Sequence, residues 1–234
     1  MARNYNHDIP SNELIIVMAG LFITFEGIDF CGKTTQAKRL ASYLTRKRYD
    51  VLLIREPGGD RIAEKIRKIL LSEKNCGMTS MTELLLYEAS RAQLTEKVIL
   101  PALKEGKVIV CDRYFDSTLA YQGYGRGLNK KTIGYLNRTS AFGLKPDLTI
   151  LLDVSVTTSF DRRNKEKRKK DRLEKERIEF HRKIREGYLK IARQDKRRIK
   201  VVDGADDIDK TWQKVKKVVD SFLSRSNRSL NKSE

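Results

Sequence analysis

The sequence is poor in the residues that build disulfide frameworks and zinc sites. It contains three cysteines and two histidines in 234 residues, and Cys31, Cys76 and Cys111 do not follow a metal-ligand spacing. An odd number of scattered cysteines favours free thiols in a reducing compartment. His7 and His181 stand alone in the sequence, and we assign neither a role.

Long apolar runs are missing as well. No run approaches the roughly 20 residues that a helix needs to cross a bilayer. The apolar stretch Leu14–Gly20 follows a segment with acidic residues and one arginine, which is not the charge pattern of a signal peptide. We therefore expect a cytoplasmic protein that does not bind membranes.

Basic residues, in contrast, are in excess. Lys and Arg number 49 against 31 Asp and Glu, a net charge of +18. Residues 161–200 alone hold 19 basic and 8 acidic side chains, so this segment contributes 19 − 8 = +11. Such a charge favours anionic partners. Its concentration in one segment indicates one element that handles phosphate groups.

A phosphate-binding motif follows the first β-rich run, Phe22–Glu26. From Gly27 to Thr34 the sequence reads G-x-x-x-x-G-K-T, the pattern of a phosphate loop. Its two glycines allow backbone N–H groups to turn toward an anion, and the helix that begins near Lys33 adds its positive end. Lys33 would contact the β- and γ-phosphates, and the Thr34 hydroxyl would bind Mg²⁺. The predicted nucleotide site comprises Gly27, Ile28, Asp29, Phe30, Cys31, Gly32, Lys33, Thr34 and Thr35.

Short apolar runs alternate with helical patterns along the rest of the chain. This alternation predicts an α/β fold of the P-loop NTPase type, with a parallel sheet of about five strands and helices on both faces. Expected strands are Phe22–Glu26, Val51–Ile54, Val108–Cys111, Leu148–Leu152 and Ile199–Val202. Expected helices are Lys33–Arg48, Ile62–Leu71, Thr82–Leu103 (bending or ending near Pro101), Phe115–Gln122, Lys130–Phe142, Glu174–Gln194 and Ile208–Leu223.

The domain organisation follows from these elements. We expect a flexible extension at 1–20, one kinase-like domain at 21–225 with a mobile lid at about 161–174, and a polar tail at 226–234. In such sheets ligands bind beyond the carboxyl ends of the strands. The phosphate loop, Arg55–Gly59 and Asp112–Arg113 all follow strands and should meet there.

A phosphate loop by itself is compatible with a GTPase, a DNA-translocating ATPase or a small-molecule kinase. A GTPase should contain a guanine-reading N-K-x-D stretch, and the sequence has none. Arginines after several strands suit transfer of a phosphoryl group onto another phosphate. Because the acceptor oxygen is already anionic, such a reaction needs positioning and charge stabilisation rather than a general base.

Five segments together resemble the thymidylate kinase family. They are FEGIDFCGKTTQAKRL (Phe25–Leu40), REPGG (Arg55–Gly59), LLLYEASRAQL (Leu84–Leu94), DRYFDSTLAYQGYGRG (Asp112–Gly127) and DRLEKE (Asp171–Glu176). They occur in the order of the family and span most of the chain. The resemblance implies transfer of the γ-phosphoryl group of ATP to dTMP with Mg²⁺, in a homodimer.

The resemblance also implies roles for individual residues. Asp29 would lie between donor and acceptor, Arg113 would contact the acceptor phosphate, and Tyr87 would stack on thymine. Tyr121 would crowd the 2′ position of the sugar. The implied dTMP site comprises Asp29, Arg55, Pro57, Tyr87, Arg91, Arg113, Ser117, Thr118, Tyr121, Gln122 and Tyr188. The implied metal region comprises Thr34, Asp112, Glu56 and Glu174.

The catalytic arginine is expected from the lid. In one type of family member an arginine stands inside the phosphate loop, where this chain has Phe30, so this chain resembles the bacterial type. We expect Arg172, then Arg162 or Arg163, to stabilise charge during transfer, together with Lys33, Asp29 and Arg113. A thiol in the phosphate loop, Cys31, predicts sensitivity to alkylation.

Three other functions are compatible with parts of the sequence. Another nucleoside-monophosphate kinase would share the phosphate loop, but Tyr87, Arg91 and Asp112–Gly127 favour dTMP. A nucleic-acid-binding ATPase would suit the net charge and should show strongly salt-dependent binding. A nucleotide sensor without catalysis is disfavoured by the intact Lys33 and Thr34. We expect no nucleic-acid partner.

Overall fold

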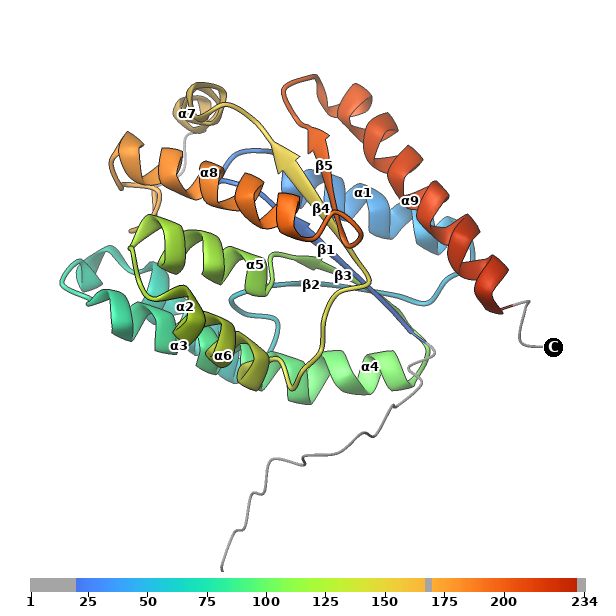
Figure 1. Ribbon diagram of the computed structural model, residues 1–234, viewed down its shortest axis with the longest axis horizontal. Coiled ribbons are helices and arrows are strands. Elements are labelled where there is room, and N and C mark those ends of the chain that lie inside the picture. Colours follow the sequence, from blue (N-terminus) through green and yellow to red (C-terminus); the bar gives the residue numbers. More distant parts are fainter. Residues whose placement is uncertain (1–19, 167–169, 231–234) are drawn as a thin grey trace, which may run out of the picture.

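Five short strands form one parallel sheet in the order β2-β3-β1-β4-β5 (Figure 1). The computed structural model describes residues 20–166 and 170–230, and the side chains of 20–166 and 170–225. The strands are β1 (Leu21–Glu26), β2 (Val51–Arg55), β3 (Val108–Asp112), β4 (Leu148–Asp153) and β5 (Ile199–Asp203). All strand pairs are parallel, which confirms the predicted fold class. A central strand that is buried on both faces explains the apolar runs.

Helices cover both faces of the sheet (Figure 1). They are α1 (Lys33–Arg46), α2 (Arg61–Leu71), α3 (Ser80–Leu94), α4 (Leu100–Lys104), α5 (Phe115–Thr118), α6 (Lys130–Ser140), α7 (Val156–Lys165), α8 (Ile178–Gln194) and α9 (Ile208–Leu230), with a short 3₁₀ turn at Glu73–Asn75. Successive side chains of β1 alternate between the two layers. Ile23 and Phe25 pack in one core with Leu40 of α1, whereas Phe22 packs in a second core with Leu94 and Leu103.

The predicted helix Thr82–Leu103 is continuous and has an irregular turn just before Pro101, near the expected position. Helix α3 passes into a π-helical turn at Thr95–Ile99 and then into α4, and Pro101 lies in the first turn of α4. Proline lacks an N–H and its ring clashes with the carbonyl four residues earlier. The wider turn before Pro101 accommodates both effects, so the helix neither ends nor breaks there. A second π-helical turn, Leu119–Gly125, follows α5.

Several further boundaries differ from the prediction, and three of these differences concern the lid and the last two helices. Residues 161–165, predicted as part of the lid, belong to α7, whose N-cap is the Ser155 side chain. Helix α8 begins at Ile178 rather than Glu174, because Asp171 accepts hydrogen bonds from the N–H groups of Leu173 and Glu174 in a separate turn. Helix α9 continues to Leu230, into the segment predicted as a polar tail. The predicted extension at 1–19, His7 and lid residues 167–169 lie outside the described residues.

None of the helices in the described part of the chain combines the length and the low charge needed to cross a bilayer.

Candidate active site

A cavity of about 1080 Å³ opens at the carboxyl ends of the strands. It is lined by the phosphate loop, by the turns that follow β2 and β3, by α3 and by residues of the predicted lid. Of the residues predicted for the site, five do not line it: Gly27, Ile28, Arg163, Arg172 and Tyr188. The other predicted residues of the site lie around this one cavity.

The phosphate loop has the backbone that its glycines predict. Gly27 and Gly32 have φ values of 139° and 95°, and a Cβ at Gly27 would lie 2.5 Å from the Leu152 carbonyl oxygen. Gly32 is the N-cap of α1 and has no side chain to cap it, so the first N–H groups of the helix are available to an anion. The Lys33 ammonium donates to the Ile28 carbonyl at 3.2 Å.

The thiol of Cys31 is buried in this loop, with 1 % exposed. Burial also raises the pKa of Cys31, and alkylation requires an accessible thiolate. The structure therefore contradicts the predicted sensitivity of Cys31 to alkylation. Cys76 is the exposed cysteine among the three.

Thr34 and Asp112 form the part of the site that suits a magnesium ion. The Thr34 hydroxyl donates to Asp112 Oδ2, while Asp112 Oδ1 is buried and has no hydrogen-bond partner among the described residues. Hydroxyl and carboxylate oxygens are ligands that Mg²⁺ prefers. Within the described ranges no group of three His, Cys, Asp or Glu side chains could hold a metal. This donor set fits an ion that is bound by one carboxylate, one hydroxyl and the phosphates of a nucleotide.

Glu56 and Glu174, the other predicted metal residues, have carboxylates bonded to protein groups. Glu56 Oε2 accepts from Arg91 at 2.9 Å, and Glu174 Oε2 accepts from the Asp171 N–H at 3.0 Å. Burial raises the pKa of Glu56 to about 7, against the lowering effect of Arg91. Both residues line the cavity, and Glu56 Oε1, like Asp112 Oδ1, is buried without a hydrogen-bond partner among the described residues.

Arg113 joins the turn after β3 to the phosphate loop. Its Nη2 donates to Asp29 Oδ1 at 2.5 Å and to the Tyr121 hydroxyl at 3.0 Å, and Tyr121 donates to Asp29 Oδ2 at 2.9 Å. Burial would raise the pKa of Asp29, but Arg113 and Lys33 hold it well below its usual range. The site therefore carries a fixed carboxylate beside a fixed guanidinium.

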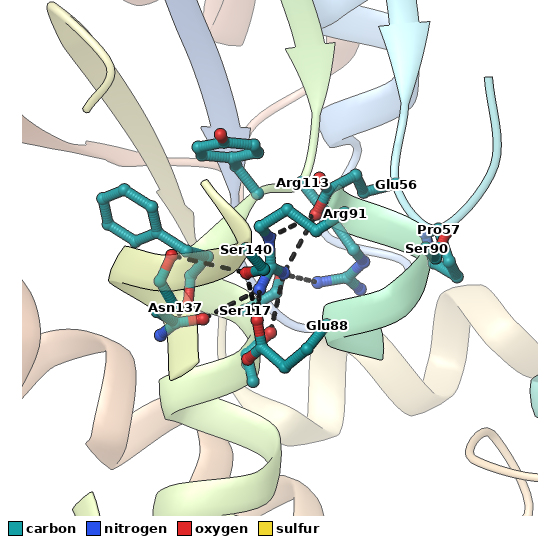
Figure 2. A network of polar contacts seen from close by, with 12 residues as sticks. Glu56, Pro57, Glu88, Ser90, Arg91, Arg113, Ser117, Asn137 and Ser140 are labelled. Atoms are coloured by element: carbon teal, nitrogen blue, oxygen red, sulfur yellow. Dashed lines mark hydrogen bonds and ion pairs between the residues drawn. The ribbon is translucent and has the colours of Figure 1, made fainter. Parts of the chain in front are cut away.

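Arg91 lies at the wall of the cavity, in a network of hydrogen bonds and ion pairs (Figure 2). Its Nε and Nη2 donate to Glu56 and Thr118, and its Nη1 donates to Glu88 and Asn137, each at 2.7–3.0 Å. A guanidinium has five N–H groups. Four of these contacts are hydrogen bonds, and the fifth is the ion pair of Nη2 with Glu56 at 2.9 Å. Arg91 also lines the cavity, so its contact with dTMP stays a prediction, and that contact would compete with these bonds.

The remaining residues of the implied dTMP site differ in their surroundings. Tyr87 is half-buried on α3, one helical turn before Arg91. Gln122 donates to Glu83 at 2.8 Å. Arg55 is exposed and pairs with Glu64 at 3.0 Å. The Ser117 and Tyr188 hydroxyls both contact Arg113 and Glu26. Pro57 follows a cis peptide bond.

The lid arginines point in different directions. Arg162 lines the cavity and donates to the carbonyls of Cys31, Gly204, Ala205 and Asp206 at 2.8–3.4 Å. Arg163 donates to the Glu174 carbonyl at 2.8 Å. Arg172, the first choice from the sequence, is buried away from the cavity. Its side chain pairs with Glu83 at 2.6 Å and donates to the Leu70 carbonyl at 3.0 Å.

Sequence reasoning missed Arg67 and Glu26. Arg67 lines the cavity and donates to the Pro57 carbonyl at 2.7 Å. It shares one face of α2 with the buried residues Ala63 and Leu70, and an arginine within an apolar stripe was the available signal. Glu26 is the last residue of β1 and is buried. Its alternation with Ile23 and Phe25 places it on the opposite face, where an acid is unusual.

Comparison with known proteins identifies the family. The family model described as thymidylate kinase matches residues 25–215. The thymidylate kinase of Geotalea daltonii is 51 % identical over 202 residues, covering 82 % of this chain and 92 % of its own length. That of Thermoanaerobacter sp. is 46 % identical and covers 88 % of this chain and all of its own length. The crystal structure of thymidylate kinase from Ehrlichia chaffeensis is 37 % identical, with a TM-score of 0.71 over 86 % of this chain and 98 % of its own. With the parallel sheet, the phosphate loop and the cavity in agreement with these matches, the chain belongs to the thymidylate kinase family.

Proposed function

We propose that this chain carries out the reaction of its family, transfer of the γ-phosphoryl group of ATP to dTMP to give dTDP, with both nucleotides in the one cavity. The observation that carries the proposal is the lining of that cavity. It combines a phosphate loop with Tyr87, Thr118 and Gln122, which can contact a nucleobase. Donor and acceptor would meet beside Asp29 and Arg113.

The donor occupies the end of the cavity formed by α1. The phosphates contact the loop N–H groups and Lys33, since the helix N-terminus and the ammonium both attract anions. Beyond the loop the cavity continues along Gly204, Asp206 and Ile208, which leaves room for the nucleoside of ATP. Thr34 and Asp112 would hold Mg²⁺, which, when bound, neutralises charge on the donor phosphates.

The acceptor occupies the opposite end. Tyr87 offers an aromatic face for thymine, and Tyr121 packs where a sugar would lie. Three cations, Arg55, Arg67 and Arg113, line this part of the wall and can bind the acceptor phosphate. Because the acceptor oxygen is already an anion, these residues contribute by positioning it and by offsetting repulsion between the two phosphates.

Arg162 is the lid arginine that the structure favours for charge stabilisation. It already lines the cavity next to the phosphate loop, and its partners are neutral carbonyls. A phosphate can replace such partners, because a charge-assisted bond is roughly twice as strong as a neutral one. We rank Arg162 before Arg172.

We further propose a homodimer formed through α2, α3 and α6. Ile62 and Ile69 of α2, Leu85 of α3 and Tyr135 of α6 are exposed by 44–65 %, and the three helices lie side by side (Figure 1). Such an exposed apolar face is typical of a subunit interface. A second copy of the chain is the partner that suits this face, because the same apolar side chains on the second copy would cover those on the first. Sedimentation analysis of the chain and of Leu85→Glu tests this: a wild-type monomer would refute it.

The free cysteines, none of them paired, support a cytoplasmic location. The basic excess leaves nucleic-acid binding as the competing function of a different class.

A coupled assay of ADP release with Mg·ATP tests the proposed function. dTMP, dUMP, dCMP, dGMP and AMP are compared as acceptors, with Lys33→Ala as the inactive control. Strong preference for dTMP is the expected result. Preference for another monophosphate would contradict the assignments of Tyr87 and Tyr121. ATP hydrolysis that is stimulated by DNA, without transfer to any monophosphate, would refute the kinase.

A further inference from the structure

Glu26 is a buried carboxylate that no step described so far requires. It ends β1, immediately before the phosphate loop, and is 1 % exposed. Its Oε1 accepts from the Tyr114 N–H at 2.8 Å. Its Oε2 accepts from the Ser117 hydroxyl at 2.5 Å and from the Tyr188 hydroxyl at 2.8 Å. Neither Glu26 nor Tyr188 lines the cavity.

The two hydroxyls connect Glu26 to Arg113. Arg113 Nη1 lies 3.0 Å from the Tyr188 oxygen and 3.2 Å from the Ser117 oxygen, and it also donates to the Gly27 carbonyl at 2.9 Å. A hydroxyl has one proton to donate. An ionised carboxylate can only accept, so a hydroxyl that gives its proton to Glu26 turns its lone pairs toward Arg113. The Ser117 and Tyr188 oxygens also lie 2.7 Å apart, within hydrogen-bonding distance of each other. Glu26 therefore sets the direction of the bonds in a linked pair of hydroxyls.

The opposite side of the same guanidinium faces the reaction. Arg113 Nη2 binds Asp29 and Tyr121, which line the cavity. Thus Nη1 of Arg113 is held by the Ser117 and Tyr188 oxygens that Glu26 orients. Nη2 is held by the carboxylate of Asp29 in the phosphate loop. A planar, bidentate donor loses its function when it tilts.

We propose that Glu26 is a positioning residue for phosphoryl transfer: by accepting protons from Ser117 and Tyr188, it orients their oxygens to hold Arg113 against Asp29 and the acceptor phosphate. This inference rests on the proposed function and extends it to a residue outside the cavity.

A purely structural role explains Glu26 less well. The Tyr114 N–H requires one acceptor, and a neutral glutamine would supply it without the penalty of a buried acid. Burial, with the nearby Asp116 carboxylate, raises the pKa of Glu26, and Arg113 opposes this rise. Tyr188, Tyr114 and Ser117 are the other polar groups that face it. Ser117 and Tyr188 both have protons to donate, and the oxygen that faces them must accept, which a carboxylate oxygen does and a glutamine amide turned by the Tyr114 N–H does not.

Glu26→Gln tests the direction of the bonds with little change in shape. The Tyr114 N–H forces the amide oxygen into the place of Oε1, so the amide NH₂ must face Ser117 and Tyr188. Their oxygens would then accept from the amide. One hydroxyl proton can pass to the other hydroxyl, 2.7 Å away, so at least one of the two protons would point toward Arg113. We expect kcat to fall about 10- to 100-fold, the usual effect of a misplaced catalytic group. The KM for ATP should stay within about twofold of its original value, because no donor-site residue changes.

Thr24→Val is the matched control. Thr24 lies on the same face of β1, is buried, and bonds to Thr149 at 2.7 Å rather than to Arg113. Both variants are assayed well below their melting temperatures, and Thr24→Val should keep its kcat. Failure of the wild type to phosphorylate dTMP would refute the proposed function. An active wild type with an equally active, folded Glu26→Gln would refute only the role of Glu26.

Combined variants separate an action through the hydroxyls from a general disturbance. Ser117→Ala/Tyr188→Phe removes both links and should lower kcat by a similar factor. Adding Glu26→Gln to that pair should then lower kcat by less than about twofold, because residues acting as one unit are not additive. Independent, multiplying losses would contradict the proposal. If Glu26→Gln does not fold, the double variant still decides: an unchanged kcat would overturn the proposal.

Discussion

Replacing Arg91 with methionine tests the network of hydrogen bonds and ion pairs around this side chain. The substitution keeps a long, flexible side chain but removes all five N–H donors. Arg91 is 1 % exposed, and Glu56 and Glu88, its carboxylate partners, are 5 % exposed. Removing it leaves two buried acids facing one another without a cation. Removing one member of a buried ion pair costs about 3–5 kcal/mol, and we expect a loss of unfolding free energy of that size at neutral pH.

The loss of unfolding free energy in Arg91→Met should depend on pH, and the charges of the two carboxyls determine whether it grows or shrinks as pH rises. A carboxyl that loses Arg91 can escape the penalty by binding a proton, which costs about 1.4 kcal/mol for each pH unit above its ordinary pKa. Between pH 7.0 and 5.5 this relief amounts to at most about 2 kcal/mol, and it is smaller for Glu56, whose pKa is already raised to about 7 beside Arg91. The folded variant retains this proton and the unfolded chain releases it, so stability is present at low pH and lost as pH rises.

Urea denaturation at pH 5.5 and 7.0, followed by circular dichroism, measures both quantities. Arg91→Met/Glu88→Gln is the matched rescue, since it removes one unpaired acid and should recover part of the loss at pH 7.0. A destabilisation below about 1 kcal/mol that does not change with pH would refute the network. If stability were unchanged while the KM for dTMP rose, Arg91 would return to the direct substrate contact predicted from the sequence.

Three further predictions concern the phosphate loop, the lid and Glu26. Arg172→Ala should lower the melting temperature and change kcat little, because Arg172 pairs with the buried Glu83. A large loss of kcat without a loss of stability would instead identify Arg172 as the catalytic arginine. Iodoacetamide should label Cys76 before Cys31 and leave activity intact, as mass spectrometry with parallel assays would show; early labelling of Cys31 would contradict its burial. Burial raises the pKa of Glu26 from 4.5 to about 7, so its favourable contribution is complete below pH 4.5 and lost as pH rises through 7. The stability of Glu26→Gln relative to the original chain should therefore rise between pH 5 and 8, and equal pH profiles in denaturation experiments would refute the shift.

The parts of the site that could be predicted depend on local sequence. Gly27–Thr34 folds as a phosphate loop because two glycines with positive φ fix the turn within eight residues. Asp112 and Arg113 reach the same edge because each follows a short apolar strand, and parallel strands place their carboxyl ends together. The predicted sheet is confirmed because short apolar runs that alternate with helical patterns are typical of parallel strands covered on both faces.

The parts that could not be predicted depend on pairing between distant residues. Sequence shows that Arg172 and Glu83 are charged, but not that a turn after α7 places them 2.6 Å apart. The link from Glu26 to Tyr188 spans 162 residues. The exact position of the π-helical turn, Thr95–Ile99 just before Pro101, also could not be predicted. Tertiary packing decides at which residues a helix accommodates the missing N–H and the ring of a proline.

The arginines of the site differ in the strength of the hydrogen bonds and ion pairs that hold them, and from this difference we propose their roles. Arg113 binds carboxylate and hydroxyl oxygens, so it is fixed before substrates arrive, as electrostatic preorganisation requires. Arg172 would have to break its pair with Glu83, which is 1 % exposed, to reach the cavity, at a cost of about 3–5 kcal/mol. Within the described part of the chain, Arg162 donates to backbone carbonyls at 2.8–3.4 Å, each worth about 1 kcal/mol. We propose that a lid arginine that follows the moving phosphoryl group needs partners that it can leave. Arg162 has such partners and lines the cavity, whereas Arg163, which also donates to a carbonyl, does not line it.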